Sequence, residues 1–367
     1  MIDPMRFFAW AVVCAAVCAS VCTSVCKAQP SYRMQEIAKD LGVVYAVTTA
    51  DVNGDGKRDI AAINNTQLLW FENPSWTRHV VAEKVTKADN VALAALDIDG
   101  DGKLDFALGA DWQSTNTASG GSLHWVSSGG AVHNIATEPT LHRIRFADVD
   151  GDRRPELIVV PLHGRGTKGP GWNDGPGARV LVFRIPKNPA AQPWPVEVAD
   201  ESLHIAHNFI TVGREIWVAA AEGVFGLRKA RGTWSKRQIG EGQPGEIKLG
   251  TVRGRRYLAT VEPWHGERIV IYEEARRGVW PRAVAVQGLN QAHALGWTGE
   301  ALIFGWRGKP WGLGGLVRDA SGGWTRFGID DGIAVEDLAI ADLNGDGREE
   351  IIAGGRATSN LRIYWAQ

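Results

Sequence analysis

Short apolar segments alternate with turn segments along most of the chain, and they recur in a fixed order. The apolar run VYAVTTA precedes the acidic loop DVNGDGKRD at 51–59, and a second apolar run, IAAI, follows it. A third run carries aromatic residues (QLLWFENP), and a fourth begins at a tryptophan (WTRHVVAE). Four short strands in a unit of roughly 45 residues are typical of one blade of a β-propeller.

The acidic loop recurs three more times, as DIDGDGKLD at 97–105, DVDGDRRPE at 148–156 and DLNGDGREE at 342–350. Three middle units keep the strand order but have ordinary glycine turns in place of this loop. The last of the seven units stops after its third strand, whereas SYRMQEIAKD near the N-terminus resembles an unattached fourth strand. We therefore predict an all-β fold, a seven-bladed β-propeller closed by an N-terminal strand that completes the last blade.

The first 28 residues have the composition of an export signal. Arg6 precedes the apolar run FFAWAVVCAAVCASVC, and Ala28 supplies a small residue at a cleavage point before Gln29. A single membrane anchor is the alternative, although the run is short for a span. All four cysteines lie in this segment. We predict a signal peptide at 1–28 and a propeller at 29–367, exported to the periplasm or the extracellular space and free of the membrane after cleavage.

The charge balance excludes one class of partner. The chain has 40 Lys and Arg residues against 41 Asp and Glu residues, for a formal net charge of −1. Because no general basic field exists to attract phosphates, we expect no nucleic-acid partner. The sequence indicates no oligomeric state.

The acidic loops have the spacing of a calcium site. Oxygen-bearing side chains at loop positions 1, 3, 5 and 9, with a main-chain carbonyl at position 7, can surround Ca²⁺. Polar turns without an ion are the alternative, because Asp and Gly favour turns. In the third loop Arg153 replaces the glycine at position 6. The predicted Ca²⁺ ligands are Asp51, Asn53, Asp55, Asp59, Asp97, Asp99, Asp101, Asp105, Asp148, Asp150, Asp152, Glu156, Asp342, Asn344, Asp346 and Glu350.

The loop and its neighbours carry a family resemblance. The pattern DxNGDGxxD followed by an apolar strand resembles the FG-GAP or VCBS repeat of integrin-type propellers. The wider combination of ENPSWTRHVV, HGRGTKG, EPWHGE, FGWRG and IIAGGRA resembles bacterial VCBS proteins related to the propeller domain of aldos-2-ulose dehydratase. This second resemblance implies carbohydrate chemistry, specifically elimination from keto-sugars.

Propeller connectivity places the acidic loops on one face and the other connections on the opposite face. Polar residues of this opposite face include His142, His204 and Glu246. The predicted catalytic residues are His163, His207, His265, His293, Arg307, Glu336, Asp337 and Arg356. The predicted substrate-binding residues are Arg165, Lys248, Trp172, Trp264 and Trp306. Neutral imidazoles beside a carboxylate can hold Zn²⁺ or another divalent metal at the channel mouth.

Two functions fit this pattern. The first is a metal-dependent lyase or dehydratase that acts on a keto-sugar at the channel mouth, with a histidine or carboxylate as base and the arginines stabilising negative charge. The second is a calcium-stabilised, non-catalytic propeller that binds a carbohydrate or a protein through the same face. Repeats and export signal are equally compatible with both.

Overall fold

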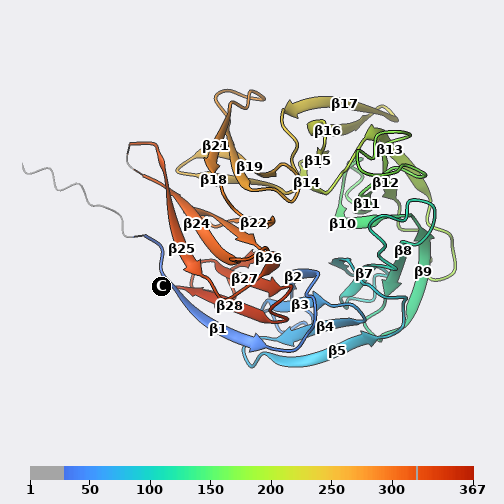
Figure 1. Cartoon of the computed structure of the whole chain (residues 1–367). Coiled ribbons are helices and arrows are strands. Elements are labelled where there is room, and N and C mark those ends of the chain that lie inside the picture. Colours follow the sequence, from blue (N-terminus) through green and yellow to red (C-terminus); the bar gives the residue numbers. More distant parts are fainter. Residues whose placement is uncertain (1–28, 320) are drawn as a thin grey trace, which may run out of the picture.

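Seven blades around a central axis make up the described part of the chain, and every regular element in it is a β-strand (Figure 1). The computed structural model describes residues 29–319 and 321–367. The predicted signal peptide at 1–28 lies outside the described residues. Seven antiparallel four-stranded sheets confirm the predicted all-β propeller.

Each blade takes its strands in chain order from the centre outward. Blade 1 contains β2 (Ala46–Ala50), β3 (Asp59–Ile63), β4 (Gln67–Glu72) and β5 (Thr77–Glu83). Blade 2 contains β6 (Ala92–Leu96), β7 (Asp105–Ala110), β8 (Ser122–Val126) and β9 (Val132–Thr137). Blade 3 contains β10 (Leu141–Ala147), β11 (Glu156–Pro161), β12 (Ala178–Phe183) and β13 (Val196–Leu203). Blade 4 contains β14 (Asn208–Val212), β15 (Glu215–Ala220), β16 (Gly223–Ala230) and β17 (Thr233–Gly240).

The remaining blades follow the same order until the chain ends. Blade 5 contains β18 (Ile247–Val252), β19 (Arg255–Glu262), β20 (Arg268–Glu273) and β21 (Arg282–Val286). Blade 6 contains β22 (Ala292–Trp297), β23 (Ala301–Trp306), β24 (Gly312–Arg318) and β25 (Trp324–Asp330). Blade 7 contains β26 (Val335–Ala341), β27 (Glu350–Gly355), β28 (Leu361–Ala366) and the N-terminal strand β1 (Tyr32–Ala38).

The two ends of the described chain close the ring. Strand β1 pairs antiparallel with β28, so that the blue and red ends of the chain lie side by side in Figure 1. Glu36 lies opposite Arg362, and its carboxylate accepts a hydrogen bond from the guanidinium at 2.9 Å. The predicted closure by an N-terminal strand is therefore confirmed, and it leaves β28 without an open edge.

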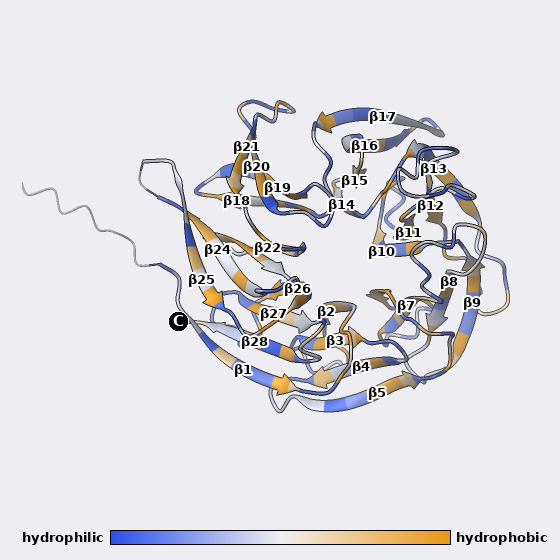
Figure 2. Ribbon diagram, in the orientation of Figure 1, coloured by the Kyte–Doolittle hydropathy of each residue, from blue (hydrophilic) through white to orange (hydrophobic). Residues whose placement is uncertain are grey.

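The apolar core lies between neighbouring blades. Every residue of β3, β7, β11 and β27 is buried, because the second strand of a blade packs against other blades on both faces. This explains why the sequence has continuous apolar runs there, not alternating ones. The outer strands β5 and β17 are mostly polar and face solvent (Figure 2).

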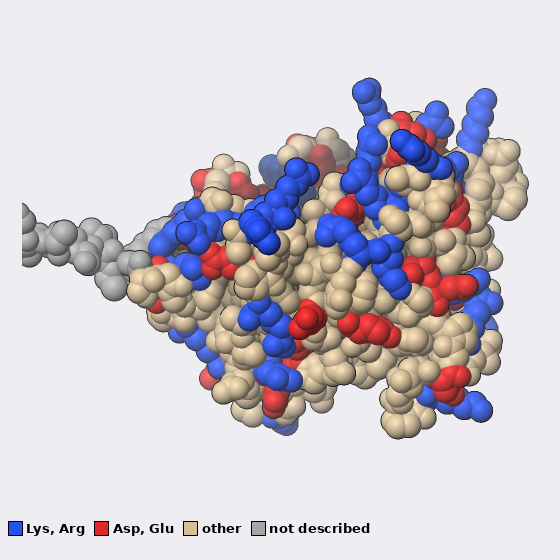
Figure 3. Space-filling view, turned by 90° about the horizontal axis from the view of Figure 1, so that it is seen from above, with Lys and Arg blue, Asp and Glu red and all other residues tan. Residues whose placement is uncertain are grey.

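The surface mixes both signs of charge. Figure 3 shows basic and acidic side chains interspersed over the side that it draws, in line with the near-neutral net charge. Within the described ranges, no helix has the length and apolar character needed to cross a membrane.

Candidate functional site

A pocket of about 410 Å³ lies at one mouth of the central channel. It is lined by eight of the residues predicted from the sequence: His163, Trp172, Trp264, His265, His293, Arg307, Glu336 and Arg356. These residues come from blades 3, 5, 6 and 7, so the closed ring is what brings them together. The pocket is concave and polar, as small-molecule sites usually are.

An extra residue at the start of the innermost strands points several side chains at this mouth. The pairing register shifts across His142 in β10, across His293 in β22 and across Glu336 in β26. Such a bulge sets two residues against one and changes the direction of a side chain. The corresponding residues of the seven blades form one ring around the axis: Tyr45, Val91, His142, His207, Glu246, His293 and Glu336.

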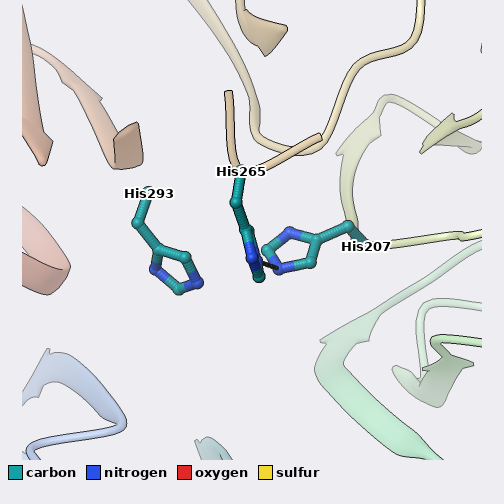
Figure 4. A group of neighbouring side chains, drawn as sticks. All are labelled: His207, His265 and His293. Atoms are coloured by element: carbon teal, nitrogen blue, oxygen red, sulfur yellow. Dashed lines mark hydrogen bonds between the residues drawn. The ribbon is translucent and has the colours of Figure 1, made fainter. Parts of the chain in front are cut away.

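Three imidazoles of this mouth point toward one another (Figure 4). His207, His265 and His293 each offer a ring nitrogen, and these nitrogens lie within 4.8 Å of one another. The Nε2 atoms of His207 and His265 are 2.6 Å apart. His207 and His293 are buried, whereas His265 is half-buried and reaches the pocket.

Hydrogen bonds determine which nitrogen of each ring carries a proton. His293 Nδ1 donates to the carbonyl oxygen of Glu336, and His207 Nδ1 donates to that of Gly245 at 3.3 Å. Both rings therefore present an unprotonated Nε2. Arg307 can only donate, and its Nη2 lies 3.2 Å from His265 Nδ1, so the proton of His265 is on Nε2.

The environment keeps the histidines neutral. Burial lowers the pKa of His265, and the charges of His207 and Arg307 lower it further. Burial also lowers the pKa of His142 and His293 well below the usual range, with Arg143 and Arg307, respectively, acting in the same direction. At neutral pH these rings are therefore uncharged, which is the form that can accept a proton or bind a metal.

Two arginines hold the carboxylate of the pocket. Arg307 Nη1 lies 2.7 and 2.6 Å from the two oxygens of Glu336, and Arg356 Nη1 lies 2.8 Å from one of them. Glu336 is buried, and these two guanidinium groups are its ion-pair partners. Arg307 and Arg356 together carry two positive charges against the one negative charge of Glu336. This group of three side chains therefore has a net positive charge at the pocket.

Aromatic rings cover one wall of the pocket. His163 stacks on Trp172 with ring centroids 4.0 Å apart, and Trp264 stacks on His265 at 4.6 Å. Among the described residues, His163 Nδ1 and Trp264 Nε1 are buried and have no hydrogen-bond partner. Burial, followed by the charge of His207, lowers the pKa of His163 to about 4.

Five residues that the sequence predicted for the site do not line the pocket. His207 lies just behind it, in contact with His265. Asp337 accepts a hydrogen bond from the backbone N–H of Val47 at 3.0 Å, so it joins two blades. The other three lie outside the pocket: Lys248 deeper in the channel beside Trp297, Arg165 on Glu138, and Trp306 on the backbone of Pro310.

Several residues that line the pocket were not predicted from the sequence, among them Tyr45, Trp112 and Arg143. Trp112 packs against His142 with ring centroids 4.8 Å apart, and Arg143 lies 3.4 Å from Glu246. Although burial opposes it, the hydrogen bond to His207 and the charge of Arg143 lower the pKa of Glu246 to about 2. One indication of Arg143 was present in the sequence: it directly follows His142, which was expected on this face.

The acidic loops lie where the first strand of a blade turns into the second. In blade 1 both oxygens of Asp51 accept backbone N–H groups of its own loop, at 2.8 Å from Gly54 and 2.9 Å from Gly56. These glycines have φ values of +78° and +85°, which explains the residue type. Carboxylates gather in blade 2 (Asp97, Asp99 and Asp101) and in blade 3 (Asp148, Asp150 and Glu156).

The ninth loop position has a different role from the others. Asp59, Asp105, Glu156 and Glu350 are buried, and each accepts a hydrogen bond from the backbone N–H seven residues earlier, at 2.8–3.0 Å. Asp59 and Asp105 each accept a second backbone bond, so both of their oxygens are already used. In blade 3, Arg184 binds Asp150 at 2.8 Å and takes a place that a cation would need.

Comparison with known proteins agrees with this architecture. Residues 51–108 match the model of the FG-GAP-like repeat, a stretch that includes the first two acidic loops. No curated protein matches the sequence. The repeat match and the seven blades together support a propeller of the FG-GAP type.

Solved structures resemble the fold at low identity. BBS1N, solved in complex with ARL6DN, is 13% identical with a TM-score of 0.57, over 91% of this chain and 96% of that chain. The AfRom2 CNH domain is 9% identical with a TM-score of 0.53, over 91% and 99%. A proposed 6-phosphogluconolactonase of Bacteroides fragilis is 12% identical with a TM-score of 0.56, over 88% and 90%. At such identities the likeness shows the fold alone.

Proposed function

We propose that the mouth pocket is the active site of a lyase that eliminates water or an alcohol from a keto-sugar. The observation that carries this proposal is the convergence of neutral imidazoles and paired guanidinium groups in one concave pocket. The sequence resemblance to VCBS proteins related to the propeller domain of aldos-2-ulose dehydratase favours the same chemistry.

The reaction needs a base, a group that accepts developing negative charge, and a proton for the leaving group. His163 is neutral at pH 7 and has an unpaired Nδ1 at the pocket wall, so it takes the proton from the carbon next to the ketone. Arg307 and Arg356 stabilise the charge that develops on the ketone oxygen. The C–O bond at the next carbon breaks, a C=C bond conjugated to the ketone forms, and the leaving oxygen takes up the proton.

The histidine trio fits a divalent metal. Nitrogens within 4.8 Å of one another, two of them already unprotonated at Nε2, match the donor type that Zn²⁺ prefers. His207, His265 and His293 would hold such an ion once the Nε2 proton of His265 is lost, and the ion would supply Lewis acidity. Hydrogen bonds from Nδ1 to main-chain carbonyls orient His207 and His293 for this role.

We extend the proposal to calcium and to location. The loops of blades 1, 2 and 7 are proposed to bind Ca²⁺ and stabilise their strand turns, away from the mouth pocket. Oxygen Oε1 of Glu350 supports a cation in blade 7, because it is buried and has no partner in the described part of the chain. Residues 1–28 are proposed to direct export to the periplasm or beyond.

A second function, glycan binding without catalysis, is favoured by the low pKa of His163 together with the aromatic wall of the pocket. A base with a pKa of about 4 is weak at neutral pH, whereas the aromatic wall of Trp112, Trp172 and Trp264 suits stacking on a sugar ring. In this case the pocket binds the same carbohydrates and returns them unchanged.

The deciding experiment combines metal analysis with ultraviolet absorbance. The purified chain is loaded with zinc, its bound metal is measured by mass spectrometry, and 1,5-anhydrofructose or a 3-keto-glucoside is added. The lyase predicts bound zinc and growing enone absorbance, both lost in His265→Ala. His133→Ala is the matched control, because His133 stacks on Trp125 in blade 2, away from the mouth pocket. Glycan affinity without any enone would favour the binding module.

A further inference from the structure

A second cavity of about 380 Å³ adjoins the mouth pocket. The two cavities share Trp264 and His265, so they adjoin at these two side chains. We name this second cavity the side groove. It lies between blades 4 and 5, and its lining includes Ala221 and Pro244 from two different connections.

The lining of the side groove is apolar. Five of its residues are aliphatic, cyclic or aromatic: Ile205, Ala221, Pro244, Pro263 and Trp264. The polar side chains of the lining are His265, already part of the mouth, and Gln243, which is exposed. A cavity of this composition selects apolar, ring-sized groups and offers little to a hydroxyl-rich sugar.

Trp264 is held firmly at the junction of the two cavities. Its backbone φ is +39°, a region that non-glycine residues adopt at a cost in energy. Its N–H donates to the carbonyl of Gln243 at 2.7 Å, and a β-bridge joins it to Pro244. The indole Nε1 is buried without a partner in the described residues, so the junction contains an unpaired donor.

We propose that the side groove receives the leaving group, and that the substrate is therefore a keto-glycoside of an aromatic alcohol. This inference rests on the proposed lyase function. Elimination of water needs no room beyond the sugar site, whereas elimination of an alcohol needs a place for the rest of that alcohol. An apolar cavity that adjoins the mouth pocket at His265 is suited to be this place.

The test separates binding in the side groove from catalysis. Phenyl β-glucoside and methyl β-glucoside lack the ketone and cannot be eliminated, so calorimetry measures their affinity alone. We expect the phenyl glycoside to bind at least about tenfold more tightly. Ala221→Trp fills the groove and should abolish this preference. Ala230→Trp, at the other end of β16 on an exposed position, should retain it.

Equal affinity of the two glycosides, or a phenyl preference that survives Ala221→Trp in a folded protein, would overturn the assignment of the groove. The lyase proposal fails separately. If phenyl 3-keto-glucoside binds with the phenyl preference but yields neither enone nor phenol, the groove stands as a binding subsite and the elimination is refuted. If enone forms from a methyl keto-glycoside while no phenyl preference exists, the lyase stands and the groove assignment is wrong.

Discussion

Arg307 donates a hydrogen bond to Nδ1 of His265 at 3.2 Å and binds Glu336 through its other terminal nitrogen. One guanidinium therefore joins the carboxylate of blade 7 to the histidine trio. Because a nearby cation repels a metal ion but stabilises a developing enolate, Arg307 should affect metal binding and catalysis in opposite directions.

Arg307→Gln tests this relationship. We expect zinc affinity to rise by about tenfold, because a positive charge beside the ligands is lost. We also expect the lyase rate to fall by about 10²–10³-fold, the usual cost of removing one charge-stabilising donor. Zinc titration and enone absorbance on the same preparation give both values. Arg356→Gln is the control, since Arg356 binds Glu336, and the hydrogen bond to His265 Nδ1 in the described structure comes from Arg307. The zinc affinity of this variant should change much less. A drop in zinc affinity for Arg307→Gln would contradict the account.

Asp59 tests the structural role of the ninth loop position. Its buried carboxylate accepts backbone bonds from Val52 at 2.9 Å and Asn73 at 2.8 Å. Asp59→Ala removes the acceptor of both N–H groups, of which that of Asn73 is buried, so the free energy of unfolding in EDTA should fall by about 2–4 kcal/mol. Urea titration measures this change. Asp55→Ala, in the exposed part of the same loop, should have a much smaller effect without calcium.

Calcium should stabilise the propeller through some loops more than others. At a hundredfold excess over its dissociation constant, one site adds about 2.7 kcal/mol. Thermal unfolding with calcium and with EDTA should show this gain, and Asp97→Ala in blade 2 should reduce it. Asp148→Ala should reduce it little, because Arg184 already binds Asp150 in that loop. An equal loss in the two variants would show that blade 3 also binds calcium.

His163 should make stability depend on pH. Its pKa is about 4 in the folded chain and about 6.5 when unfolded, so unfolding takes up a proton between these values. The contribution is complete above about pH 6.5 and decreases as the pH falls toward 4, by up to about 1.4 kcal/mol per pH unit. The slope of unfolding free energy against pH measures the number of protons taken up on unfolding. In His163→Leu this number should be smaller by up to one between pH 5 and 6.5. An unchanged slope would mean that His163 is not neutral by burial.

The fold was predictable because each blade repeats its own signals. The acidic loop, the apolar second strand and the tryptophan at the fourth strand recur, and the orphan strand at 32–38 had one unpaired partner to join. Closure of the ring then followed, because β28 would otherwise have an open edge with unpaired backbone groups.

The site was predictable in part, from the face on which each connection emerges. His163, His265 and His293 line one pocket, as that reasoning requires. The direction of single side chains was not predictable, because it depends on local register. Arg143 reaches the pocket next to a bulge in β10, whereas Trp306, at the end of β23, donates to the carbonyl of Pro310 and does not line the pocket. Arg165 donates a hydrogen bond to Glu138 and does not line the pocket, and no sequence pattern connects these two residues.

Elimination is tested most directly by proton NMR of a single reaction mixture. Zinc-loaded protein is incubated with phenyl 3-keto-glucoside, and the products are quantified over time. The account predicts that an enone and phenol appear in equal amounts as the keto-glycoside disappears, and that neither appears with His163→Leu. Phenol released together with an intact keto-sugar would indicate hydrolysis, and an unchanged spectrum would indicate binding alone; either result would contradict the proposed lyase.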